Sequence, residues 1–142
     1  MFATTHFHPM LVHFPIAIIT IGFLADLASL FFGKEQCLSK MGFWLEIVGM
    51  VAAIAAFGTG YFFTGSMEGE AGAMREKHEF YATITLITII IATLFRIIIN
   101  YLNKENTHLK YASLGLFFLA FVFVSITGFL GGTLVIEYMI GL

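Results

Sequence analysis

The chain has 142 residues, of which 59% are hydrophobic and only 11% are charged, and its mean hydropathy is +0.93. A soluble domain carries about 25% charged residues, so this composition indicates an integral membrane protein, and the length allows one compact unit. The net charge of −2 leaves no basic patch for nucleic acid, and the single Cys37 excludes an internal disulfide or a CxxC site.

Four segments are apolar enough to cross a bilayer, which takes about 20 residues in a helix. They are 10–32, 42–64, 79–101 and 111–135. The first and third breaks are short and polar, so we expect an all-α, four-transmembrane-helix antiparallel bundle that forms a single membrane domain over residues 1–142. The middle break is longer, and the helix formers in AGAMREKHEF allow the third helix to begin near Ala73.

Basic residues favour the cytoplasmic side of a membrane protein. Five of them lie in or beside the first and third loops, whereas two lie in the middle loop. The two groups are Lys34, Lys40, Arg96, Lys104 and Lys110 against Arg75 and Lys77. We therefore expect a multi-pass protein of a bacterial inner membrane, with both termini and the middle loop in the periplasm.

The two short loops align at an offset of 70 residues, GKEQCLSK at 33–40 with NKENTHLK at 103–110. The aligned residues are Lys34 with Lys104, Glu35 with Glu105 and Lys40 with Lys110, and the same offset pairs Gly58 with Gly128. Two tandem hairpins of one topology predict a pseudo-two-fold axis along the membrane normal. Chance similarity between two short polar loops is the alternative.

Three of the five histidines, His6, His8 and His13, stand at the start of the first span, and His78 opens the third. Ionisable side chains are costly in hydrocarbon, so a membrane protein that keeps them there usually uses them, and imidazole suits a metal or a haem iron. We predict that His13 and His78 are the axial ligands of a haem b near the outer face, with His8 as a supporting partner or alternative ligand. Two alternatives remain, namely hydrogen-bonded interfacial histidines, or a copper or zinc ion on His6, His8 and His13.

The second and fourth spans end on the same side in glycine-rich sequence, AFGTGYFFTG and ITGFLGGTLV. Glycine lets a backbone approach a neighbour or a flat ligand closely, so we expect room for the macrocycle there. The candidate residues are Gly58, Gly60, Gly128, Gly131 and Gly132. Helix packing and C-capping are the alternative uses. Pro15 is expected to kink the first helix beside His13.

Three charged residues, Asp26, Glu46 and Arg96, lie near the cytoplasmic ends of three different spans. Each would be costly without a partner, so we expect a structural ion pair in which Arg96 bridges the two carboxylates. The functional alternative is a proton-entry carboxylate or a quinone contact.

The segments HPMLVHFPIAIITIGFLADL and GFLGGTLVIEY resemble the bacterial membrane family called domain of unknown function 2231. The matching positions are His8, Pro9, Val12, His13, Phe14 and Pro15, and then Gly131, Gly132, Leu134 and Val135. Members often carry a histidine after the closing motif, where this chain has Glu137, Tyr138 and Met139. Related segments are joined to c-type cytochrome modules in some bacteria, so the resemblance implies electron transfer by association.

These patterns favour a membrane-integral electron-transfer subunit that works with a c-type cytochrome, a quinone or a larger respiratory-type membrane complex. The alternatives are a non-redox structural subunit of a larger membrane complex and a periplasmic-side metal-binding membrane protein. The sequence has no phosphate-binding loop and no nucleophile beside a base, so it predicts no catalytic residue and leaves enzyme activity open.

Overall fold

The computed structural model describes residues 7–32, 36–65, 67–102 and 106–138. The helices are α1 (Phe7–Leu11), α2 (His13–Phe31), α3 (Gln36–Phe63), α4 (Gly69–Tyr101) and α5 (Thr107–Tyr138). These ranges contain no strand, and four helical segments are long and apolar enough to cross a membrane when α1 and α2 count as one. The all-α membrane bundle predicted from the sequence is confirmed.

The helices α3, α4 and α5 begin before the spans predicted from hydropathy. The difference is largest for α4, which begins at Gly69 rather than at residue 79, because its first turns, GEAGAMREKH, are polar but rich in helix formers. At about 1.5 Å per residue, α4 is roughly 50 Å long and exceeds a hydrocarbon core of about 30 Å. Hydropathy detects only the part of such a helix that lies in lipid.

The first span is divided at Val12, between α1 and α2. Pro15 follows in the first turn of α2, where it has no N–H to donate and its ring crowds the carbonyl of Leu11. The interruption therefore lies at Val12, directly beside His13, where the sequence predicted that Pro15 would kink the helix. It separates His8, on α1, from His13, the first residue of α2.

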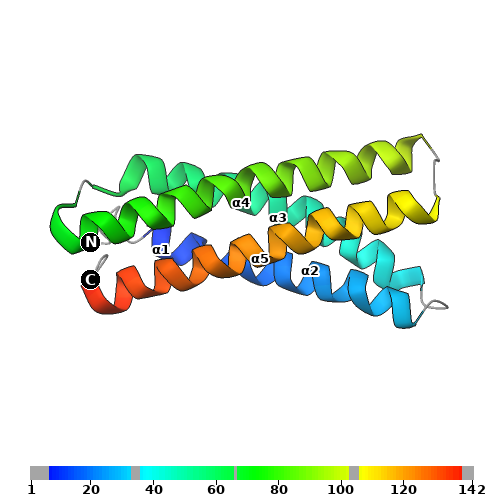
Figure 1. Ribbon diagram of the computed structural model, residues 1–142, viewed down its shortest axis with the longest axis horizontal. Helices are drawn as coiled ribbons and strands as arrows, with labels where there is room; N and C mark the ends of the chain where they lie inside the picture. Colours follow the sequence, from blue (N-terminus) through cyan, green and yellow to red (C-terminus); the bar gives the residue numbers. More distant parts are fainter. Residues whose placement is uncertain (1–6, 33–35, 66, 103–105, 139–142) are drawn as a thin grey trace.

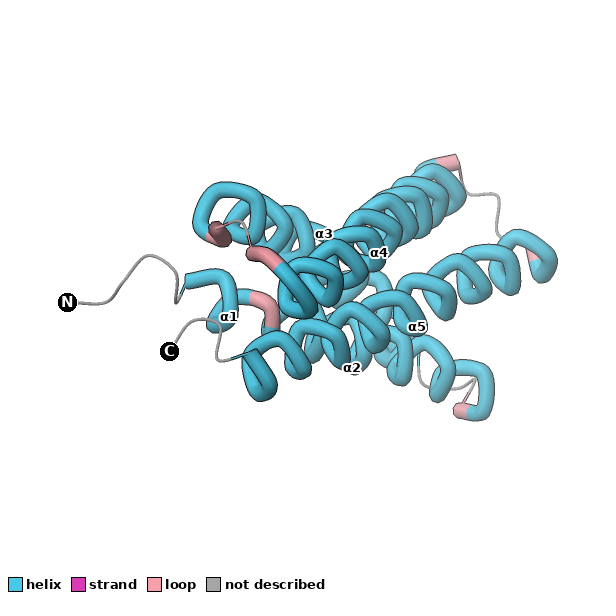
Figure 2. Tube along the Cα trace, turned by 60° about the vertical axis from the view of Figure 1, so that its left-hand side comes forward, coloured by secondary structure: helices cyan, strands magenta, loops and turns pink. Residues whose placement is uncertain are grey.

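Two antiparallel hairpins build the bundle, α2 with α3 and α4 with α5, as Figure 1 shows. The hairpins meet through α2 against α5 and α3 against α4, while α1 packs on α3. We call the end that holds α1 and the last turns of α5 the histidine end, and the end at Phe31, Gln36, Tyr101 and Thr107 the ion-pair end. The two hairpins diverge toward the ion-pair end (Figures 1 and 2).

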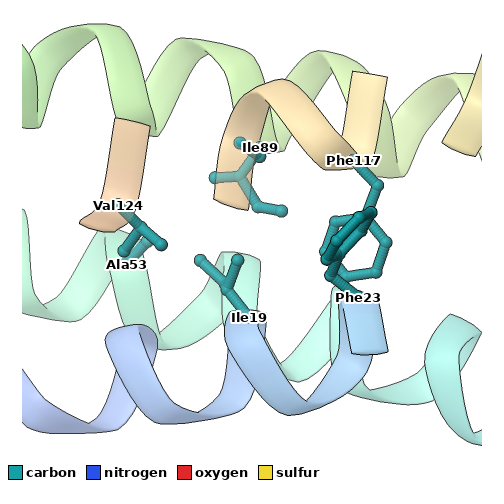
Figure 3. Packing of buried hydrophobic residues seen from close by; sticks show 7 residues of the cluster. Ile19, Phe23, Ala53, Ile89, Phe117 and Val124 are labelled. Carbon is teal, nitrogen blue, oxygen red and sulfur yellow. The ribbon is translucent and has the colours of Figure 1, made fainter. Parts of the chain in front are cut away.

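A cluster of apolar side chains fills the middle of the bundle (Figure 3). In it Ile19 of α2 and Ile89 of α4 are fully buried, and Phe23 meets the edge of the Phe117 ring at a centre-to-centre distance of 6.0 Å. The outward faces of the helices instead expose large apolar side chains, as expected for surfaces that meet lipid. Lipid is as apolar as this core, so close packing rather than the exclusion of water holds the helices together.

Burial repeats between the two hairpins. Every buried residue of α4 lies 70 positions after a buried residue of α2: Pro15 with Thr85, Ile19 with Ile89, Gly22 with Ala92, Phe23 with Thr93, and Ser29 with Ile99. In α3 and α5 the offset is 71, which pairs Gly42 with Ser113, Glu46 with Phe117, Gly49 with Ala120, and Ala53 with Val124. This pattern supports the tandem repeat, with one residue more in the second hairpin, and it replaces the predicted pairing of Gly58 with Gly128.

Candidate functional site

The histidine end brings together the side chains of His8 and His78. His8 comes from α1 and His78 from the third turn of α4, and both rings are partly buried. Their centres are 6.3 Å apart and their planes cross at 75°. His8 and His78 are 70 residues apart, the same offset that relates the buried residues of α2 and α4, so they occupy equivalent places in the two hairpins.

Each histidine is held by a main-chain carbonyl of another helix, α3 for His8 and α5 for His78. Nδ1 of His8 lies 3.0 Å from the carbonyl oxygen of Ala56, and Nδ1 of His78 lies 3.1 Å from that of Thr127. A carbonyl can only accept a hydrogen bond, so in both rings Nδ1 carries the hydrogen and donates it. In the neutral imidazoles Nε2 is then a bare acceptor, and this is the tautomer in which a histidine binds a metal through Nε2.

The two Nε2 atoms cannot satisfy one another. Both are acceptors in these tautomers, and a direct N–H···N bond of up to about 3.2 Å would require ring centres within roughly 5.5 Å. An imidazole nitrogen lies about 2 Å from a metal ion and about 1 Å from its own ring centre, so two rings on opposite sides of one ion have centres roughly 6 Å apart. The observed 6.3 Å matches that arrangement. A water molecule that donates both hydrogens would also satisfy the two acceptors.

The glycines at this end do not share one role. A Cβ atom at position 60 would lie 2.9 Å from Cε1 of His8, and one at position 131 would lie 3.1 Å from Cε1 of His78. Gly60 and Gly131 therefore make room for the histidine rings against α3 and α5. Gly128 makes room for Ile16 of α2, whereas Gly58 and Gly132 face open space at the Cβ position. Clearance for a macrocycle remains a prediction for these last two.

His13 lies apart from this pair. It is exposed at the start of α2, although the sequence favoured it as the partner of His78. His8, on α1, contacts the carbonyl of Ala56 on α3 and the ring of His78, whereas the His13 side chain at the start of α2 is exposed. The offset of 70 that aligns the two loops also aligns His8 with His78, and this signal could have identified the pair. His6 lies outside the described residues.

At the ion-pair end, Arg96 of α4 bridges Asp26 of α2 and Glu46 of α3, as the sequence led us to expect. Nη1 of Arg96 donates to Asp26 and, over 2.9 Å, to Oε2 of Glu46, while Nη2 donates over 2.7 Å to Oδ1 of Asp26 and over 3.2 Å to the carbonyl oxygen of Ser39. Asp26 and Arg96 are also 70 residues apart, so they occupy equivalent positions in the two hairpins.

A polar cavity of about 280 Å³ lies at the ion-pair end, where the hairpins diverge. Asp26 and Arg96 form part of its wall, and Lys110 of α5 lines it as well. The remaining lining is mostly hydroxyl and amide side chains: Ser29, Ser39, Asn100, Asn106, Thr107 and Ser113, with Leu30, Ile99 and Leu114. A cavity of this size with polar lining groups has room for water beside the Asp26–Arg96 pair. The hydropathy of the sequence did not predict this cavity.

The two sites are separated along the bundle. Arg96 lies eighteen positions after His78 on α4, which corresponds to about 27 Å at 1.5 Å per residue. Within the described ranges, no group of three or more His, Cys, Asp or Glu side chains is placed to hold a metal ion. A closed zinc site, which takes four protein ligands, therefore has no candidate there.

The fold and these sites define a small polytopic membrane protein with a histidine pair near one end of its bundle and a buried ion pair near the other. The chain belongs to the family described as "Predicted membrane protein (DUF2231)", whose model matches residues 4–142. This confirms the resemblance seen in the opening and closing motifs. Neither the curated proteins nor the solved structures contain a significant match to the chain.

Proposed function

We propose that the protein is a membrane-integral electron-transfer subunit that binds haem b between His8 and His78. The observation that carries the proposal is a pair of imidazoles with ring centres 6.3 Å apart, each with Nδ1 donating to a carbonyl and Nε2 left as an acceptor. The proposal keeps His78 from the sequence prediction and takes His8, the alternative ligand, in place of the exposed His13.

The number of ligands favours haem over a bare metal ion. Two imidazoles are too few for a protein-bound zinc or copper site, but they complete a six-coordinate iron whose other four ligands are porphyrin nitrogens. The residues present fit this group, because the ring separation of 6.3 Å accommodates one iron and the carbonyls of Ala56 and Thr127 hold the required tautomer. Bound haem would supply reversible one-electron chemistry.

The protein's own groups would position and tune such a ligand pair. The carbonyl of Ala56 and the hydroxyl of Thr59 both contact Nδ1 of His8, and the carbonyl of Thr127 contacts Nδ1 of His78. Hydrogen bonds of this kind fix ring orientation and raise the basicity of the ligating nitrogen. Gly60 and Gly131 allow each ring to lie close to the helix that holds it.

The position of the pair suggests where electrons would be exchanged. His8 and His78 lie near one end of the bundle, and the distribution of basic residues assigns that end to the periplasmic face of a bacterial inner membrane. A redox partner would then approach from that side. A c-type cytochrome, a quinone within the bilayer, or a larger respiratory-type membrane complex fits this role.

The test is spectroscopic. The protein is expressed with haem supply, purified in mild detergent, and measured for haem per chain and for oxidised and dithionite-reduced visible spectra. We expect a reduced α-band and close to one haem per chain. His8→Ala and His78→Ala should each lower haem retention by at least about tenfold. Removing a group that only hydrogen-bonds a metal ligand already costs about tenfold or more in affinity, so removing a ligand should cost at least as much.

His13→Ala is the matched control, because His13 is an exposed histidine of the same span. It should retain haem at the wild-type level. Retention in both His8→Ala and His78→Ala, or loss in His13→Ala, would contradict the pairing. A featureless wild-type spectrum at full protein recovery would favour the non-redox structural subunit, with water between the imidazoles.

A further inference from the structure

The buried charges at the ion-pair end do not balance. Asp26 and Glu46 bring two carboxyl groups to one guanidinium, that of Arg96, and Asp26 and Glu46 are only 6% and 1% exposed. With both carboxyl groups ionised, the cluster would hold one uncompensated negative charge. An isolated ion is far more costly to bury than a neutral polar group, so the cluster should take up one positive charge.

Hydrogen bonding distinguishes the two carboxyl groups. Both oxygens of Asp26 accept N–H groups of Arg96, which is the bidentate arrangement of an ionised carboxylate. Glu46 accepts only through Oε2, and its Oε1 is buried without a hydrogen-bond partner among the described residues. Oε1 of Glu46 is therefore the oxygen at which a positive charge would neutralise the cluster without breaking an existing hydrogen bond.

A proton fits this atom better than a metal cation does. A metal cation needs several ligands, and in the described part of the chain no group of three or more acidic, histidine or cysteine side chains is placed to hold one. The charged groups that face the cluster are Asp26 from α2, Arg96 from α4 and, across the polar cavity, Lys110 from α5. None of the cationic groups among them lies within hydrogen-bonding distance of Oε1 of Glu46.

The polar cavity comes within one side chain of Glu46. Asp26 and Arg96 line it, and Nη1 of Arg96 donates to both Asp26 and Glu46, so one guanidinium joins the cavity wall to the buried glutamate. We propose that Glu46 is a proton-binding site, a buried carboxylic acid that exchanges its proton with water in the cavity past the Asp26–Arg96 pair. Hydronium in the cavity gives the proton, and water there accepts it when it leaves.

Infrared spectroscopy tests this directly. The full chain in detergent at neutral pH, equilibrated in H₂O and then in D₂O, should show the carbonyl stretching band of one protonated carboxylic acid. The band should shift in D₂O because the proton exchanges through the cavity. It should disappear in Glu46→Gln and remain in Glu137→Gln, a matched change at an exposed glutamate.

Carboxyl-¹³C labelling of glutamate identifies the band even when Glu46→Gln does not fold, because the label moves a glutamic-acid band and leaves an aspartic-acid band in place. The proposal is overturned by a wild-type spectrum without the band, by a band that the glutamate label does not move, or by a band that does not shift in D₂O. The measurement does not depend on the histidine pair, so its outcome is separate from that of the haem test.

Discussion

Replacing Arg96 by Met tests how much the ion pair contributes to the fold. The substitution keeps an unbranched side chain but removes the guanidinium that donates to Asp26, to Oε2 of Glu46 and to the carbonyl of Ser39. Because Asp26 is 6% exposed, its carboxylate would be left buried without its cation. Breaking a buried pair in this way costs about 3–5 kcal/mol, and we expect a loss of that size in the free energy of unfolding.

When Glu46 carries a proton, Arg96→Met leaves one buried carboxylate, that of Asp26, without a cation. The loss in the free energy of unfolding should then be close to the cost of one unpaired buried charge rather than two. Unfolding is measured by titrating SDS into detergent micelles and following helix content by circular dichroism. Asp26→Asn provides the second arm of a double-mutant cycle, because Asn keeps the shape but removes the charge. The double variant should be less destabilised than the sum of the two single variants, since removing the carboxylate removes the main penalty of losing Arg96.

Two results would refute this reasoning. An Arg96→Met variant within about 0.5 kcal/mol of the wild type would place these residues among surface sites, where substitutions have little effect. Effects of Arg96→Met and Asp26→Asn that simply add would show that the two side chains do not interact, because coupled neighbours deviate from additivity by about 0.5–3 kcal/mol.

Two further predictions concern the core and the orientation. Ile19→Ala should lower the free energy of unfolding by about 2–5 kcal/mol in the same titration, because Ile19 is fully buried. Ile21→Ala is the control and should have little effect, because Ile21 is 52% exposed. Equal effects of the two substitutions would contradict the assigned core. Cys37 is exposed at the ion-pair end, so a membrane-impermeant maleimide should label it in inverted vesicles but not in intact spheroplasts, and the reverse pattern would reverse the assigned orientation.

Hydropathy and the rarity of charge in lipid were enough to predict the spans and the ion pair. A charged residue inside an apolar span needs a partner, and Asp26, Glu46 and Arg96 are at similar depth in three spans, so their meeting follows from chain topology alone. Hydropathy alone missed the polar first turns of α4, whereas their helix formers predicted a start near Ala73, about one turn after the observed start at Gly69. The polar cavity was missed because it depends on how far the hairpins diverge, which no local pattern encodes.

The choice between His8 and His13 depended on the direction of a side chain rather than on its depth. Both lie near the same end of the first span, and only helix phase and the interruption at Val12 separate them. The roles of the glycines had the same limit, because the sequence locates Gly60 and Gly128 at similar depth without saying that one meets His8 and the other Ile16. The internal repeat carried the missing information, since His8 and His78 are equivalent residues of the two hairpins, as are Asp26 and Arg96, and each pair is in contact.

The pairing of Asp26 with Arg96 also determines which hairpins can assemble with each other. A hairpin that paired with a second copy of itself would bring two carboxylates, or two guanidiniums, to one buried point, and like charges there repel strongly. Exchange of hairpins between neighbouring molecules is compatible with these charges only when α2–α3 of one meets α4–α5 of another. The histidine pair, identical in both halves, imposes no such choice, so assembly specificity resides at one end of the bundle and the candidate ligand site at the other.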